Sequence, residues 1–291
     1  MSSNNFNKIK QVLWLILFAN LAVALLKIIA GSVIKSTSMT ADGFHSLTDG
    51  SSNIVGLIGI NLASKPMDEE HPYGHKKFET LSGLFIGGML FFIGGRIIVS
   101  AVTRFFNPVP ITVTFESLIS LIITLIINIF VSRYEYKQGK KLNSYILVSD
   151  SLHTKSDIFV SIGVLFTLIC VKLGLPSVID PIASLIVSGF VIHAAYEIFK
   201  GASGILVDRA VLDTEKIKEI AFEFEEVKGV HKIRSRGTEN DMYVDMHILI
   251  DPSLSVEKSH RLTHNIEKKM QEEISSNTQV NIHIEPYYDN V

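Results

Sequence analysis

Hydrophobic residues in the first two thirds of the chain come in long stretches rather than in the short periods of a surface helix or strand. Six such stretches occur, at about 11–34, 39–63, 82–103, 113–132, 145–172 and 177–199. Each is long enough to cross about 30 Å of hydrocarbon as a helix. The pattern therefore predicts an all-α bundle of six transmembrane helices within residues 1–207. The first stretch is too long for a signal peptide and no small-residue cleavage site follows it, so we expect a retained helix.

From about Asp208 onward the chain turns polar and its periodicity changes, which predicts a separate domain over residues 208–291. The expected elements are helices at 213–227 and 255–275, with Ser255 as N-cap, and strands at 230–238, 241–250 and 278–285. Their order, αββαβ, predicts a ferredoxin-like α+β domain with its helices on one face of a small sheet. In the last strand Val280, Ile282 and Ile284 should face the helices, which leaves His283 and Glu285 on the opposite face.

Charged residues are few, and their placement indicates an orientation in the membrane. The chain is 47% hydrophobic and 19% charged, with a net charge of -2, which is typical of a membrane protein and gives no basic surface for nucleic acid. The basic residues of alternate loops fall on one side: Lys8, Lys10, Lys65, Lys76, Lys77, Arg133, Lys137, Lys140 and Lys141. By the positive-inside rule, this side and both termini are cytoplasmic. The single cysteine, Cys170, excludes a disulfide or a thiolate metal cluster within one chain.

The second and fifth apolar stretches carry the same polar motif, D-x-x-H-x-x-x-D. Its members are Asp42, His45 and Asp49 in the second stretch, and Asp150, His153 and Asp157 in the fifth. Spacings of three, four and seven residues place each set on one face of a helix. Because a charged side chain at membrane depth costs at least about 2.5–3.5 kcal/mol, these carboxylates and imidazoles need a compensating partner. A divalent cation held between the two helices would be such a partner.

The expected ligands of this cation are His45, Asp49, His153 and Asp157. Two neutral imidazoles and two carboxylates suit tetrahedral Zn²⁺, and their net charge of two minus matches the ion. We expect Asp42 and Asp150, a turn nearer the helix starts, to lie near the outer interface, solvated, capping a helix or lining a release path. The alternatives are helix-end polar residues, a buried hydrogen-bonded network, or a proton relay without metal.

With these motifs and the loop Asp68-Glu-Glu-His71-Pro-Tyr-Gly-His75-Lys-Lys-Phe-Glu79, the chain resembles the cation diffusion facilitator family over nearly its whole length. The resemblance implies six transmembrane helices, a cytoplasmic metal-binding domain, and a homodimer that exports divalent metal by alternating access, usually in exchange for protons. Some members have Asp at the first ligand of the second helix. This chain has His45 there and is similar to the zinc-preferring subgroup. Fe²⁺, Co²⁺, Ni²⁺, Cd²⁺ and Mn²⁺ stay open as other cargoes.

The resemblance also implies metal positions outside the membrane. Asp68, His71 and His75 would form a secondary site in the loop between the second and third helices. A polar turn shaped by Pro72 and Gly74 is the alternative there. The same resemblance pairs Lys77 with Asp208 as a hinge or dimer brace.

In the C-terminal domain the resemblance implies a metal cluster at the dimer interface. Its members would be His231, His247, His260, His283 and Glu285. Glu285 stands where a family aspartate often stands, which leaves the bridging geometry open. His264, one turn after His260 on the same helix face, could join or replace it.

These features together favour a Zn²⁺/H⁺ antiporter and not an enzyme. No HExxH motif or nucleophile-and-base set accompanies the ligands, and four protein ligands leave no open position for water. Metal would be substrate and regulatory ligand, with no catalytic cofactor. A membrane metal sensor or scaffold without transport is the alternative. The short, histidine-poor connection between the fourth and fifth helices differs from the long His-rich loops of many eukaryotic relatives, so we expect a prokaryotic plasma membrane.

Overall fold

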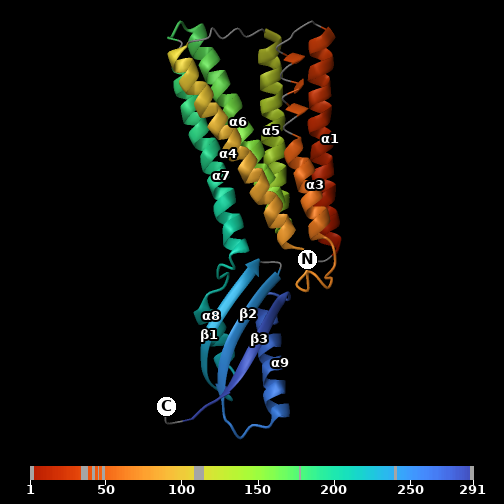
Figure 1. Ribbon diagram of the computed structural model, residues 1–291. Coiled ribbons are helices and arrows are strands. Elements are labelled where there is room, and N and C mark those ends of the chain that lie inside the picture. Colours follow the sequence, from red (N-terminus) through yellow and green to blue (C-terminus); the bar gives the residue numbers. More distant parts are fainter. Residues whose placement is uncertain are drawn as a thin grey trace. The chain divides into compact units, whose positions relative to one another are not determined.

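The computed structural model describes residues 3–33, 39–40, 43–44, 46–47, 50–107, 115–176, 178–238 and 241–288 (Figure 1). The chain divides into two compact units, Ser2–Ala202 and Ser203–Val291. The first consists of helices, and almost the whole of the second is a small sheet with two helices.

Long apolar helices make up the first unit. They are α1 (Ser3–Val33), α3 (Ser51–Ala63), α4 (Lys77–Phe106), α5 (Phe115–Leu142), α6 (Tyr145–Lys172) and α7 (Ile179–Leu206). Five of them, all except α3, are long and apolar enough to cross a membrane, which confirms five of the six expected spans. For the remaining span, α3 is a shorter apolar helix, and Asp42, His45 and Asp49 lie outside the described residues.

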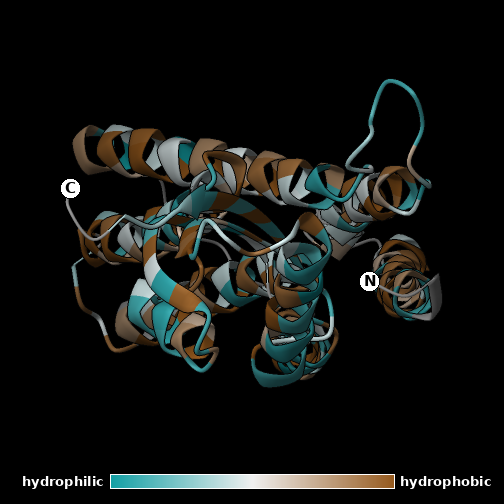
Figure 2. Cartoon of the chain, turned by 90° about the horizontal axis from the view of Figure 1, so that it is seen from below, coloured by the Kyte–Doolittle hydropathy of each residue, from teal (hydrophilic) through white to brown (hydrophobic). Residues whose placement is uncertain are grey.

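Three of these helices end later than their apolar stretches, α4 by three residues and α5 and α7 by more. Helix α5 continues to Leu142 and α7 to Leu206, past the expected ends at 132 and 199. The added turns of α5 hold Arg, Glu, Gln and Lys, which favour helix, and a helix satisfies its own backbone hydrogen bonds in lipid and water alike. Large apolar side chains such as Phe92 and Phe130 are exposed, as lipid-facing residues would be. Broad hydrophobic bands cover the long helices in Figure 2.

Glycines let the helices of this unit approach closely. An added Cβ atom at Gly83 of α4 would lie 2.7 Å from the Tyr145 ring of α6, and one at Gly87 would lie 2.9 Å from Ile198 of α7. Gly88, on the same helix, has nothing within 4 Å of that position. One face of α4 is therefore packed through small residues, as is common between membrane helices.

The second unit has the expected αββαβ order. Its elements are α8 (Thr214–Phe222), β1 (Val227–Thr238), β2 (Asp241–Ile250), α9 (Val256–Glu273) and β3 (Thr278–Pro286). The sheet order is β1-β2-β3, with β1 antiparallel and β3 parallel to β2. A parallel pair needs a crossover connection, which α9 supplies. The expected N-cap is confirmed, because the Ser255 side chain accepts a hydrogen bond from Lys258 N at 3.4 Å.

The core of this unit lies between one face of the sheet and both helices. Alternate residues of β2 from Met242 to Ile250 are buried, and the β2 side chains in the core pack with Ile217 and Ile220 of α8 and Ile266 of α9. Val280, Ile282 and Ile284 of β3 pack against the same cluster, which confirms the predicted facing of the last strand. The opposite face of the sheet is left for polar side chains.

Candidate metal sites

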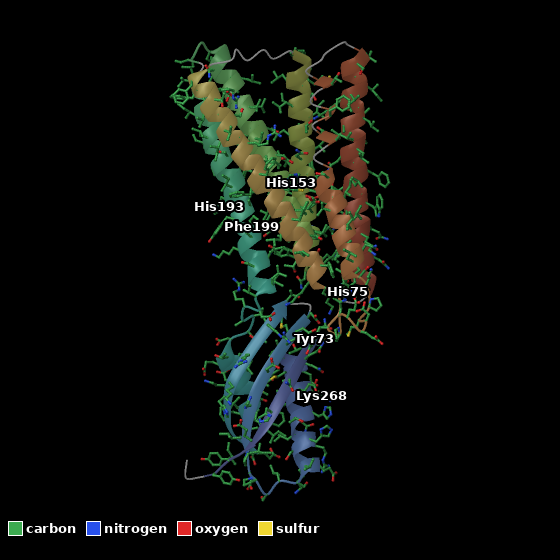
Figure 3. The ribbon with its side chains drawn as sticks, viewed as in Figure 1. Tyr73, His75, His153, His193, Phe199 and Lys268 are labelled. Atoms are coloured by element: carbon green, nitrogen blue, oxygen red, sulfur yellow. The ribbon has the colours of Figure 1, made fainter. Side chains whose placement is uncertain are left out.

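His153 lies inside the helical bundle on α6 (Figure 3). Its side chain is only 3% exposed, and neither ring nitrogen has a hydrogen-bond partner among the described residues. Burying an imidazole without partners is costly, so these nitrogens are free to bind a ligand. Helix α6 carries the side chain there because it packs against three neighbours, α3, α4 and α5.

His153 and Asp157 line one cavity of about 30 Å³, which holds a water-sized group. The polar residues of its wall include Asn20, Ser46, Thr124, Asn128, His153 and Asp157. The structure thus brings together the two expected ligands of α6. His45 and Asp49 lie outside the described residues, so their part in the site stays a prediction.

The solvated position expected for Asp150 is wrong. Its side chain is 1% exposed rather than solvated, and its Oδ2 atom accepts a hydrogen bond from Asn53 Nδ2 of α3. Asn53 in turn accepts a hydrogen bond from Asn20 of α1 at 3.0 Å. The physical reason is the packing of α6 against α3, which encloses position 150 between helices. Asp42 lies outside the described residues.

Sequence reasoning missed two polar residues of this region. One is Asn53, which joins α1 to α6 through its amide. The other is Glu135 of α5, which is fully buried and accepts a hydrogen bond from Thr154 Oγ1 at 3.0 Å. An available signal was the amide of Asn53 within an apolar stretch, whereas Glu135 lies beyond the expected end of its stretch at 132.

The loop before α4 brings Asp68, His71 and His75 together. One ligand atom of each lies within 4.8 Å of the others. Asp68 Oδ1 is 3.1 Å from His71 Nδ1, and Asp68 Oδ2 is 3.3 Å from His75 Nε2. The turn is built locally, because the backbone N–H of His71 donates to Asp68 Oδ1 at 2.7 Å and Gly74 adopts a positive φ of 84°.

A further hydrogen bond orients His75 of this loop group for metal binding. His75 is buried, and its Nδ1 is 3.0 Å from the carbonyl of Pro66, so an Nδ1–H donor leaves Nε2 as the ligand atom (Figure 3). The pKa of the Asp68 carboxyl is lowered. Partial desolvation would raise it, but hydrogen bonds from the His71 backbone and ring and the charges of His75 and His71 outweigh that effect. Two imidazoles and an ionised carboxylate form a set that Zn²⁺ prefers.

A row of histidines crosses the open face of the C-terminal sheet. His231 of β1 is paired in register with His247 of β2, which is paired with His283 of β3. Side chains at one register position point to the same face, so strand pairing alone sets the row. Glu285, two residues further along β3, lies 3.1 Å from His231 Nε2 and 2.7 Å from His247 Nδ1.

His231, His247 and Glu285 therefore form a group able to hold a metal ion, with His283 next to it. The pKa of Glu285 is lowered, first by the hydrogen bond from His247 and then by the charges of His231 and His247, although some desolvation opposes this. A β-bulge directly after His231, with Lys232 at a positive φ of 50°, bends β1 at this point. The carboxylate is held ionised between the imidazoles.

Two histidines that were expected in or beside this cluster lie apart from it. His260 of α9 is exposed and packs edge-on against His264, with ring centroids 4.6 Å apart. Within the described chain neither joins the group around Glu285, so a role for them in a dimer stays a prediction. Asp208 lies 3.6 Å from Arg236 in its own unit. Its expected pair with Lys77 would join the two units and also stays a prediction.

Replacing Glu285 by glutamine should weaken zinc binding to the cluster by more than about 10–100-fold, because the carboxylate is a ligand candidate and also contacts two of the imidazoles. Zinc retained per protomer after dialysis of the full-length protein against graded free zinc would measure this. Glu267→Gln is the matched control, since Glu267 lies 3.5 Å from His264 on the surface of α9. Equal zinc retention by both variants would show that Glu285 binds no metal.

Comparison with known proteins gives consistent matches over both units. A family model described as the cation efflux transmembrane domain matches residues 13–207, and one described as the cation efflux protein cytoplasmic domain matches residues 211–287. An uncharacterized transporter of Methanocaldococcus jannaschii, MJ0449, is 35% identical over 87% of this chain and 90% of its own. The manganese efflux system protein MneP of Bacillus subtilis is 29% identical over 99% of this chain and 100% of its own.

Among solved structures, the metal-bound C-terminal domain of the CzcD transporter from Thermotoga maritima is 25% identical to this chain. The matched region covers 28% of this chain and 100% of that domain, with a TM-score of 0.24.

Proposed function

The chain belongs to the cation diffusion facilitator family, whose members export divalent metals, and we propose that this member exports zinc in exchange for protons. It is a multi-pass membrane protein. The observation that carries the proposal is His153, buried with both ring nitrogens unpartnered among the described residues, beside Asp157 at a cavity of about 30 Å³. His45 and Asp49 would complete the ligand set from the second span.

Zinc is the proposed cargo because of the ligand chemistry. Imidazole nitrogen binds Zn²⁺ well, whereas Mn²⁺ favours sets made of oxygen ligands. Two histidines and two aspartates therefore support zinc. The names of MneP and of a second relative, MneS of Bacillus subtilis, point to manganese and make it the main competing cargo. Ferrous iron, cobalt, nickel and cadmium are further alternatives that the same ligand set would accept.

Proton coupling follows from the protonation states of the ligands. Zinc binds neutral imidazole and ionised carboxylate, so binding releases protons and protonation releases zinc. A histidine with an ordinary pKa near 6.5 changes charge close to neutral pH. Zinc–proton exchange then requires that the zinc-bound site open to one side of the membrane and that the protonated site open to the other side.

Residues 1–207 form the transmembrane domain, and residues 208–291 form a cytoplasmic domain for dimerisation and regulation, with both termini cytoplasmic in a plasma membrane. Zinc on the cluster around Glu285 and on the loop group of Asp68 would signal a high cytoplasmic level. Such a signal would favour one orientation of the homodimer if that orientation binds the ion more tightly.

Zinc flux into proteoliposomes tests the exporter against a sensor or scaffold. With the vesicle interior more acidic than the outside, the wild type should take up zinc, and uptake should stop when an ionophore removes the pH gradient. A zinc-binding protein that moves no zinc under either condition would be a sensor or scaffold. Zinc uptake that is equal with and without the pH gradient would reject proton exchange but not zinc transport.

The cargo assignment is tested by His45→Asp in a metal-competition assay. Replacing imidazole by carboxylate at this ligand should shift uptake from zinc toward manganese, because the set then contains more oxygen. The measurement is uptake of each ion from equimolar mixtures, for wild type and variant. His71→Asp, which alters a histidine of the loop group instead, is the control. An unchanged preference in the His45 variant would mean that this nitrogen does not select the ion.

A further inference from the structure

Two buried carboxyl groups outside the proposed ligand set lie together in the helical bundle. Glu135 of α5 is 0% exposed and Asp150 of α6 is 1% exposed. Thr154 Oγ1 connects them, because it donates to Glu135 Oε2 at 3.0 Å and lies 3.2 Å from the backbone carbonyl oxygen of Asp150. Helices α5 and α6, which carry these two residues, lie side by side (Figure 1).

Each carboxyl has one satisfied oxygen and one unsatisfied oxygen. Glu135 Oε2 accepts from Thr154 Oγ1 at 3.0 Å, and Asp150 Oδ2 accepts from Asn53 Nδ2. Glu135 Oε1 and Asp150 Oδ1 are buried and have no donor among the described residues. Ionised carboxylates only accept hydrogen bonds, so two of them in contact repel each other and leave both atoms unsatisfied.

The surrounding charges do not relieve this repulsion. No lysine or arginine in the described part of the chain forms an ion pair with either carboxyl. The lysines of α1 bind elsewhere, because Lys10 donates to Asn61 and Ser64 and Lys27 donates to Ser46. Arg133 and Lys137 of α5 are exposed. Helix α3 has no titratable residue.

The other titratable groups near the pair do not supply a positive charge either. Glu79 of α4 accepts from Ser144 and the backbone N–H of Ile146. On α6, His153 follows one turn after Asp150, and Asp157 adds repulsion on Glu135.

We propose that Glu135 and Asp150 form a proton-binding site that shares one proton between Glu135 Oε1 and Asp150 Oδ1. The shared proton turns one oxygen into a donor and removes one of two like charges, so both unsatisfied atoms gain a partner. The neighbouring hydrogen bonds from Thr154 and Asn53 fix Glu135 Oε2 and Asp150 Oδ2, which leaves the other two oxygens for the shared proton.

This site is joined to the metal cavity by Thr154. Its hydroxyl binds Glu135, and the same residue lines the cavity beside His153 and Asp157. When zinc enters, the carboxyl O–H bond breaks, the proton passes to water in the cavity, and both carboxylates remain ionised. When zinc leaves, a proton from water forms the O–H bond again. The extra negative charge therefore exists only while the cation is bound, a coupling that rests on the proposed zinc–proton exchange.

Infrared difference spectroscopy of the full-length protein in lipid vesicles tests the site. The zinc-free wild type should show the C=O band of a protonated carboxyl, shifted in D₂O and lost when zinc is added. Glu135→Gln and Asp150→Asn should each lack the band while eluting as folded, monodisperse protein. Glu197→Gln, which changes an exposed carboxyl of α7, should retain it.

A count of protons released per zinc bound, in weak buffer, gives a second readout that should fall by about one in Glu135→Gln. A band that persists in both pair variants, or is absent from the zinc-free wild type, overturns the proposal. So does a loss of one zinc ion per protomer at saturation without any band, which would make the pair a metal site. The spectra need no transport, so failure of zinc uptake by the wild type would count against the exporter alone.

Discussion

Zinc uptake by proteoliposomes should fall at least about 100-fold when His153 is replaced by alanine. Replacing a residue that only orients a ligand already costs 10–100-fold in metal affinity, and loss of the ligand itself should cost more. His153 is the described residue that offers unpartnered nitrogen at the cavity, so alanine leaves oxygen ligands and a larger void. Initial rates of uptake with a zinc-sensitive dye inside the vesicles would give the ratio.

His193→Ala is the matched control for this prediction. This histidine also lies in a membrane-spanning helix, but its side chain is 67% exposed on α7 and lies 3.6 Å from Glu197 (Figure 3). Its removal should leave zinc uptake within about twofold, because His193 does not line the cavity of His153 and Asp157. Similar uptake by the His153 variant and the wild type would show that the buried imidazole is not a ligand at the transport site.

Replacing Gly83 by leucine should destabilise the membrane domain by about 1–3 kcal/mol or more, the usual cost of overpacking a filled core. A Cβ atom there would lie 2.7 Å from the Tyr145 ring and 2.9 Å from Ser149 Oγ. Tyr145 cannot easily move aside, because its hydroxyl donates to the Ile198 carbonyl and lies 2.8 Å from where a Cβ of Gly201 would be. The measurement is the free energy of unfolding in mixed micelles.

Gly88→Leu provides the comparison on the same helix. Open space surrounds that position, and leucine favours helix more than glycine by up to about 1 kcal/mol, so this variant should be as stable as the wild type or slightly more so. Equal destabilisation at both positions would mean that α4 does not meet α6 through Gly83.

The helices were predictable because lipid leaves few alternatives. A backbone in hydrocarbon must satisfy its own hydrogen bonds, so each long apolar stretch becomes a helix of at least that length. What hydropathy did not predict was the polar extension of α5 to Leu142, since a helix continues into water wherever its residues favour it. The histidine row was predictable in part, because alternation along β3 decides that His283 and Glu285 share a face.

The environment of Asp150 could not be predicted in the same way. Helical periodicity says which residues share a face, but it does not say which helix covers that face. Asp150 is enclosed because α3 and α5 pack on α6, and these contacts join residues far apart in sequence. Glu135 was missed for a related reason: it stands between Arg133 and Lys137, so its neighbours in sequence indicate a solvated turn. Only tertiary packing turns it inward.

The histidine row has a consequence for biosynthesis. Its third strand, β3, is the last of the three in chain order, and it supplies both His283 and Glu285. A nascent or truncated polypeptide that stops before Thr278 carries His231 and His247 but lacks the carboxylate between them. A pairing slip of one residue would turn His283 and Glu285 toward the helices instead. Full affinity for an ion on this face would thus arise only in a domain whose third strand is present and paired in the observed register.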